Sequence, residues 1–366
     1  MKLTAAEQKS LKPHLDRTID AIEEILTAGL TTANDATTQT FAVTFQEASR
    51  MKLLRLGSTL RSTHEEVSRH VRDDERFSQS RLMFFLNRSW LLCKGIDQAI
   101  IDGDDQHLEK LLWTAPAKKV KSLAVVCLGV VKKIAAGTFC AFDFRLRSLA
   151  DGRPLSWSTV FPMKAGVEIP AEGYLHIPQK QKFTANSFLE GQVIHISEAM
   201  VTESEGASSR LQMTDDAEVK LGDTVADWQP FLSWNVDNAV DRIRNHEISP
   251  FDVEVELQEE VTFDDYSIGK AESDGARDRT VFPLRFRDAE FDVIVSSGIE
   301  GESTVAGLKP QIRRKTPAPM FGLMHYAGCR LVVQPLTLFD DGKPNYITIS
   351  DKSVDRKALL SALKFT

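Results

Sequence analysis

The 366-residue sequence lacks long apolar runs, paired cysteines and a general excess of basic residues. No stretch approaches the roughly 18 consecutive apolar residues that a membrane-spanning helix needs, so we expect no membrane partner. The first residues turn polar and acidic at once and lack the apolar core and cleavage site of a secretion signal. The sequence therefore predicts a cytoplasmic protein.

Cysteines are few and widely separated, at positions 93, 127, 140 and 329. No Cys-x-x-Cys pair occurs, so neither a zinc knuckle nor a disulfide framework is expected. We interpret Cys93, Cys127, Cys140 and Cys329 as buried free thiols.

Signatures of catalysis are also missing. There is no Gly-x-Ser-x-Gly elbow, no His-Glu-x-x-His helix and no dinucleotide fingerprint. The run from Gly298 to Thr304 is superficially similar to a phosphate loop, but Glu302 stands at the lysine position and its carboxylate would repel phosphate. His195 lies opposite its two isoleucine neighbours and is interpreted as structural. We predict a non-enzymatic protein without cofactor or metal; an enzyme site built from acidic loops between modules is the lesser alternative.

The net charge of −7 is unevenly distributed along the chain. It amounts to −2 over residues 1–114, +2 over 115–222 and −7 over 223–366. Non-specific duplex binding usually requires a basic protein, because phosphate contacts supply the affinity. The composition therefore does not favour that activity.

These three segments are the domains we expect in an α+β protein: a helical bundle (1–114), an OB-like β-barrel (115–222) and a second β-rich module with short helices (223–366). Apolar residues recur every three or four positions from Leu11 to Leu26, from Leu53 to Val67 and from Leu82 to Ile100. With Thr31 to Thr40 as a link, this predicts a three- or four-helix bundle. The excess of basic residues between Arg50 and Lys94 could bind phosphate groups, or it could form a solvated surface that is paired with acidic residues of the chain. We favour the second interpretation.

Period-two alternation predicts five strands in the middle segment, at residues 120–131, 137–147, 155–160, 192–197 and 210–213. Their spacing, with a long connection after the third strand, is typical of an OB-like barrel. In the last segment, strands are expected at residues 251–257, 280–286, 291–295, 330–339 and 346–349, with a hairpin turn at Asp340 to Pro344 and a closing helix from Val354 to Leu363.

The second predicted strand of the barrel carries the candidate binding surface. Cys140, Phe142 and Phe144 form its apolar, inward face, so the opposite face is expected to be open. On an OB-type sheet this face binds ligands through aromatic and cationic side chains. The candidate binding residues are Phe139, Arg145, Arg147, Trp157, Lys132 and Lys133. They suit a nucleic-acid strand, an acidic protein partner or the acidic part of the chain itself.

Three runs, Leu53 to Arg61, Val125 to Val131 and Val333 to Phe339, resemble the non-zinc part of bacterial proteins that accompany SWIM zinc fingers, MoxR-type AAA+ ATPases and von Willebrand factor A proteins. The SWIM signature, Cys-x-Cys followed by Cys-x-His, is absent, so no zinc site carries over. The resemblance implies a component of a multi-protein, ATPase-linked system in stress or conflict response, with an AAA+ ATPase or a von Willebrand factor A protein as partner.

Two functions follow as hypotheses. The first is a non-enzymatic binding or adaptor component of a bacterial multi-protein system. The alternative is a single-stranded nucleic-acid-binding protein that uses the open face of the barrel. Salt-dependent binding to single-stranded DNA or RNA, and its loss when Arg145 and Arg147 become Glu, would distinguish them.

Overall fold

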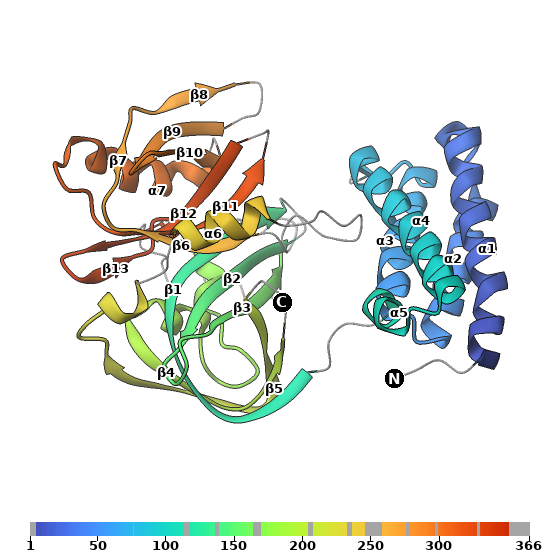
Figure 1. Cartoon of the computed structure of the whole chain (residues 1–366), viewed down its shortest axis with the longest axis horizontal. Helices are drawn as coiled ribbons and strands as arrows, with labels where there is room; N and C mark the ends of the chain where they lie inside the picture. Colours follow the sequence, from blue (N-terminus) through green and yellow to red (C-terminus); the bar gives the residue numbers. More distant parts are fainter. Residues whose placement is uncertain are drawn as a thin grey trace, which may run out of the picture. The chain divides into compact units, whose positions relative to one another are not determined.

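A computed structural model of the chain shows two compact units, one helical and one rich in strands (Figure 1). The predicted α+β class, with a helical part followed by a barrel and a second sheet, is confirmed. The second unit contains both β-rich regions, the barrel and the second sheet. The structure describes residues 5–75, 77–112, 117–135, 139–163, 170–203, 208–232, 236–245, 258–275, 279–296, 299–327 and 330–350.

The described residues of the helical unit form α1 (Ala5–Ala28), η1 (Leu30–Thr32), α2 (Asp35–Arg50), α3 (Leu54–Val71), α4 (Gln79–Asp102) and α5 (Asp105–Leu112). Helix α1 packs against α4, and α2 packs against α3. Their apolar stripes meet in one core that includes Leu15, Phe41, Leu56 and Ile96, all fully buried. The three predicted helices correspond to α1, α3 and α4.

Helix α2 occupies part of the segment predicted as a link, so that prediction was wrong. Asn34 starts the helix through a capping box: its side chain accepts hydrogen bonds from two amides of the first turn, and Thr37 Oγ1 accepts one from the Asn34 amide at 3.2 Å. Phe41 and Ala48, seven residues apart, are buried. The Thr- and Ala-rich composition concealed this apolar stripe because small residues contribute little to a hydrophobic pattern.

The strand-rich unit begins with a closed barrel. It is formed by β1 (Ala117–Ala135), β2 (Phe139–Ser148), β3 (Pro154–Pro162), β4 (Gln192–Thr202) and β5 (Ser209–Thr224). The strands, labelled in Figure 1, follow the order β1-β2-β3-β5-β4, and β4 pairs back with β1. Neighbours are antiparallel except β3 and β5, which run parallel. A five-stranded Greek-key barrel of this order has the OB architecture, as predicted.

The barrel interior is aromatic. Phe142 and Phe144 of β2 are fully buried, which confirms the predicted inward face. The connection between β3 and β4 contains two short 3-10 helices, η2 (Ala171–His176) and η3 (Ala185–Leu189). Phe188 of η3 and the preceding Phe183 pack against Trp157, with ring centroids 4.7 and 5.5 Å from the indole. The connection thus contributes to the barrel core.

The second sheet has eight described strands. They are β6 (Glu259–Phe263), β7 (Ser267–Ile268), β8 (Glu272–Asp274), β9 (Arg279–Phe286), β10 (Ala289–Ser296), β11 (Met320–Ala327), β12 (Arg330–Asp340) and β13 (Lys343–Asn345). The main order is β6-β11-β12-β10-β9-β7, with β13 beside β12 and β8 beside β9. Asp341 and Gly342 have φ values of 50° and 69° and join β12 to β13, which fits a type I′ turn. A turn is thus present within the predicted Asp340 to Pro344, but its second strand is β13 rather than residues 346–349.

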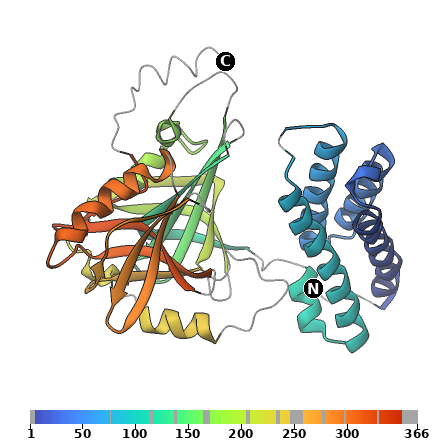
Figure 2. The same cartoon turned by 90° about the horizontal axis from the view of Figure 1, so that it is seen from above.

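One face of the second sheet packs on the outside of β1, and helices cover the other. Val126, Leu128 and Val131 of β1 share a core with four sheet residues, Phe321, Leu323, Leu336 and Phe339. The opposite face packs on α6 (Val236–Arg244) and on Leu308, the last residue of α7 (Ile299–Leu308), which Figure 2 shows alongside the sheet. The helix α7 occupies the segment in which we rejected a phosphate loop.

Gly129 lies at a close contact between β1 and the second sheet. A Cβ atom at this position would lie 2.9 Å from Leu336 Cβ and 3.0 Å from Phe321 Cδ1. A β-bulge between Cys127 and Gly129 interrupts the pairing of β1 with β2 at the same place. Glycine is therefore required by the packing between barrel and sheet.

Residues 346–349, predicted as a strand, do not form one. Instead, Tyr346 enters the barrel core and its hydroxyl donates a 3.0 Å hydrogen bond to the Cys127 carbonyl. Thr348 Oγ1 donates to the Val130 carbonyl at 2.7 Å. The alternating pattern of residues 346–349 was misleading because Tyr346 and Thr348 form hydrogen bonds to β1, and the segment does not extend the β12–β13 hairpin.

The predicted strand at 251–257 and helix at 354–363, as well as Cys329, lie outside the described residues.

Candidate functional site

The outer surface of β2 and β3 is arranged in rows across paired strands. Lys133 of β1 aligns with Ala141 and Val160, and Phe139 aligns with Pro162. Further along, Asp143 pairs with Ser158 and Arg145 with Ser156. This surface is where an OB barrel binds its ligand, and the predicted binding residues divide into buried and exposed ones along it.

Arg147 is buried beneath strand β6. Only 3% of its surface is exposed, and Nη2 donates a 2.9 Å hydrogen bond to Glu260 Oε2. Burial lowers the pKa of the guanidinium from its usual value, while the Glu260 carboxylate opposes that shift. The prediction that Arg147 is open to a ligand was therefore wrong: the second sheet covers it.

Arg145 is also sequestered, at 8% exposure. Its Nη2 donates to Asp143 Oδ2 at 2.7 Å, and Asp143 Oδ1 accepts a 3.0 Å hydrogen bond from Ser158 Oγ. The expected exposure of Arg145 was wrong as well. A sequence signal existed, because Asp143 shares the same strand face two residues away and can pair with the arginine.

Trp157 points into the barrel rather than outward. It is the cross-strand partner of Phe144, so both rings lie on the inner face, with centroids 5.0 Å apart. Alternation then places Ser158 and Val160 outside, and Val160 is 61% exposed. The outward assignment of Trp157 was wrong, and Val160 is the exposed residue that the sequence reasoning missed.

The two neighbouring lysines have different surroundings. Lys132 points inward, and its Nζ donates a 2.7 Å hydrogen bond to Glu172 Oε1 of η2. Burial by itself would raise the pKa of Glu172, but the contact with Lys132 outweighs it and the pKa is lowered. Lys133 is exposed and forms no ion pair with any described residue. Only Lys133 of this pair is available to a ligand.

What remains open on the sheet is a small mixed surface, which we call the open β2–β3 end. It consists of Lys133, Phe139, Ala141, Val160 and Pro162. Phe139 is 37% exposed and provides one aromatic ring, Val160 adds apolar surface, and Lys133 adds a positive charge. This combination allows a base or apolar group to stack while an ammonium contacts an anion.

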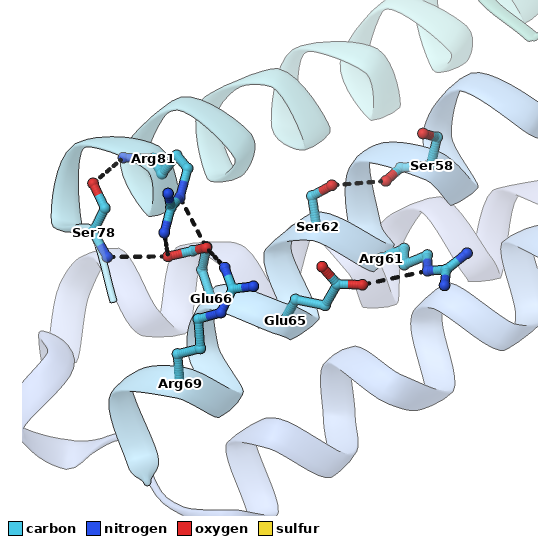
Figure 3. Close-up of polar contacts among 8 residues, drawn as sticks. All are labelled: Ser58, Arg61, Ser62, Glu65, Glu66, Arg69, Ser78 and Arg81. Atoms are coloured by element: carbon cyan, nitrogen blue, oxygen red, sulfur yellow. Dashed lines mark hydrogen bonds and ion pairs between the residues drawn. The ribbon is translucent and has the colours of Figure 1, made fainter. Parts of the chain in front are cut away.

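The basic residues of the helical unit are largely paired within it. Glu66 of α3 is buried and accepts hydrogen bonds from Arg81 Nε at 2.9 Å and the Ser78 amide at 3.1 Å (Figure 3). Arg69 contacts the same carboxylate, and Arg61 pairs with Glu65. These pairs match the interpretation of the basic excess as an internally paired surface.

A pocket of about 230 Å³ lies where β1 meets the second sheet. Its polar lining includes Lys132, Arg279 and His325 but no carboxylate among the described lining residues. Lys132 is paired with Glu172, and Arg279 is paired with Asp274 at 2.9 Å. The pocket therefore presents little uncompensated charge.

Three of the four cysteines lie in the part of the chain that the structure describes, and they are buried as expected. Cys93, Cys127 and Cys140 are buried and free, and burial raises the pKa of Cys127 to about 12 and of Cys140 to about 11.

No group of three or more His, Cys, Asp or Glu side chains suited to a metal occurs among the described residues. His195 is exposed, opposite the buried Ile194 and Ile196. No helix in the described part of the chain is long and apolar enough to cross a membrane.

Comparison with known proteins finds no matching family model and no matching curated protein. Among solved structures, the Ifi202 HINa domain in complex with a 20-bp double-stranded DNA is similar at 8% identity and a TM-score of 0.32, over 60% of this chain and 94% of that one. A murine DNA-binding protein bound to double-stranded DNA gives 9% and 0.28, over 64% and 100%. A replication protein A heterotrimer bound to single-stranded DNA gives 11% and 0.31, over 68% and 52%. All three TM-scores lie below 0.5, so the fold assignment rests on the strand order.

Proposed function

We propose that this protein binds single-stranded nucleic acid at the open β2–β3 end of its barrel. The observation that supports this most directly is the exposed Phe139 ring beside Lys133 and Val160 on a closed OB-type barrel. The face of strands two and three is where this architecture holds oligonucleotides. No metal or cofactor is part of the proposal.

The expected contacts are limited in number. Phe139 stacks on one base, Val160 packs beside it, and Lys133 contacts a phosphate. Because Arg145 and Arg147 are occupied by Asp143 and Glu260, they add no charge to this surface. The barrel alone therefore contributes weak affinity and little sequence discrimination.

The test uses a fluorescein-labelled oligothymidylate of about 16 nucleotides, the upper end of the site size for one OB fold. Phe139→Ala is expected to weaken binding roughly 5- to 150-fold, because stacking of one base is worth about 1–3 kcal/mol. Fluorescence anisotropy of the full chain measures the dissociation constant at low salt.

Leu221→Ala is the matched control, because Leu221 is a similarly exposed apolar residue (41%) on β5 of the same barrel. It is expected to bind like the wild type. Equal affinity of the Phe139→Ala variant and the wild type would contradict the proposed barrel site.

A second candidate is the adaptor function within an ATPase-linked system. Two observations favour it: the sequestration of Arg145 and Arg147, and an exposed apolar pair on α4, Met83 (46%) and Phe84 (48%). We propose a MoxR-type AAA+ ATPase or a von Willebrand factor A protein as the partner. Co-purification with such a protein from the same genome, lost in the Met83→Ser/Phe84→Ser double variant, is the expected result. Undiminished co-purification of the double variant would exclude α4 as the contact.

A further inference from the structure

A second positively charged surface lies far from the barrel in the sequence, directly after α7. The net charge of the whole chain is −7, yet the stretch from Ser303 to Phe339 contains no Asp or Glu. Four basic residues fall within seven positions of this stretch, Lys309, Arg313, Arg314 and Lys315. We call Lys309 to Lys315 the cationic segment; its first five residues form the 3-10 helix η6 (Lys309–Arg313).

Three of the four cations are available. The side chains of Lys309, Arg313 and Lys315 are exposed, and none forms an ion pair with a residue that the structure describes. Most exposed lysines of the barrel, by contrast, form ion pairs: Lys118 pairs with Glu203 at 2.8 Å, and Lys220 pairs with Glu218 at 2.9 Å. The cationic segment therefore concentrates uncompensated positive charge.

The backbone of the cationic segment is held in place from both sides. Gln311 is 3% exposed, and its Oε1 accepts a 2.9 Å hydrogen bond from the Ala318 amide. The Tyr266 hydroxyl donates to the Ala318 carbonyl, also at 2.9 Å. Arg314 donates two hydrogen bonds, of 2.8 and 2.7 Å, to the carboxylate of Asp340. The three available cations thus project from an anchored segment, which reduces the entropy lost when they bind a ligand.

Four acidic residues have to be considered around the cationic segment. Asp340 is bonded to Arg314, and Asp341 also helps to raise the pKa of Arg314. The other two, Asp264 and Asp265, directly precede Tyr266. Both are exposed, and neither forms an ion pair with a described residue. Among the described residues, direct acidic contact with the cationic segment is thus made at Arg314, and Lys309, Arg313 and Lys315 keep their charge uncompensated by an ion pair. A ligand with several negative charges at regular spacing suits such a surface better than a single carboxylate does.

We propose that the cationic segment binds the phosphate backbone of a nucleic-acid strand. A 3-10 helix rises about 2 Å per residue, so Lys309 and Arg313 lie about 8 Å apart along its axis, far enough for each to contact a different phosphate. Contacts of this kind do not read bases. The inference extends the proposed function to a second contact that supplies the charge missing from the barrel.

The test is a salt titration with the same labelled oligothymidylate and the triple variant Lys309→Ala/Arg313→Ala/Lys315→Ala. Each phosphate contact to a single strand contributes about 0.7 to the slope of log affinity against log salt concentration. Loss of three contacts is expected to reduce that slope by about 2. The control is Lys118→Ala/Lys119→Ala/Lys220→Ala, which removes the same formal charge from lysines paired with Glu203, Glu198 and Glu218.

The outcomes separate the two proposals. A reduced slope in the triple variant and not in the control supports the cationic segment, even where Phe139→Ala binds normally and the barrel site is refuted. An unchanged slope with weaker binding by Phe139→Ala refutes the cationic segment and leaves the barrel site. Equal slope changes in both triple variants indicate a general charge effect and also refute binding by the cationic segment. Wild-type binding to phosphatidylserine vesicles without binding to the oligonucleotide overturns both proposals.

Discussion

The buried ion pair between Arg147 and Glu260 connects the barrel to the second sheet, and its removal should be costly. Glu260→Leu removes the carboxylate that pairs at 2.9 Å with the guanidinium of Arg147, which is only 3% exposed. Breaking a buried pair from one side typically costs about 3–5 kcal/mol, because the remaining buried charge loses the compensation that the removed partner supplied. We expect a loss of that size in the free energy of unfolding of the strand-rich unit.

The double variant Arg147→Met/Glu260→Leu removes both charges together. Well-packed apolar replacements of a buried pair are often neutral or stabilising by about 1–4 kcal/mol, since neither ion then has to be desolvated. The double variant is therefore expected to be at least as stable as the wild type, whereas the single variants Glu260→Leu and Arg147→Met are each destabilised. Urea unfolding, with pulsed hydrogen exchange of peptides from β2 and β6, assigns each change to this unit.

The reasoning would be refuted if Glu260→Leu cost less than about 1 kcal/mol, the usual worth of an exposed pair. It would equally fail if the double variant lost as much stability as the two single variants combined. Additive losses indicate that the two side chains do not interact, contrary to the 2.9 Å contact.

Two further predictions concern packing and pH. Gly129→Ala is expected to destabilise the strand-rich unit by about 1–3 kcal/mol in urea unfolding, because the new methyl group overlaps Leu336 and Phe321; unchanged stability would contradict the close approach. For Glu66, burial would raise the pKa, but Arg81 and Arg69 outweigh it and the pKa lies below the usual 4.5. Its contribution to stability is thus complete above about pH 4.5 and is lost as the pH falls through the folded-state pKa. Glu66→Gln should reduce the stability of the helical unit at neutral pH and flatten its decline in acid, as measured by urea midpoints across that range.

The barrel was predictable because its signal is local. Alternation within β2 fixes Phe142 and Phe144 on one face whatever surrounds the strand. The covering of Arg147 by the acidic part of the chain was one of three alternatives that the sequence left open, and local alternation could not choose between them because the partner, Glu260, lies on a strand 113 residues later. Only the folded chain determines which part of an outer face is left exposed.

The lysines show a second limit of local patterns. Before the bulge, Val125 and Cys127 point inward; after it, Val130 and Lys132 do, so the bulge shifts the phase of β1 by one residue. A pattern extended without the bulge assigns these positions to the wrong faces. The helix α2 escaped detection for another reason, because its buried positions are mostly small residues.

The placement of Tyr346 within the barrel has a consequence for how the chain acquires its structure. The five barrel strands are complete at residue 224, yet a side chain more than a hundred positions later fills part of their interior and bonds to Cys127. The native core of the barrel is therefore complete only when that later segment has been added. A fragment that ends after β5 lacks this side chain and its hydrogen bond, so we expect its barrel to be less stable than the barrel of the full chain.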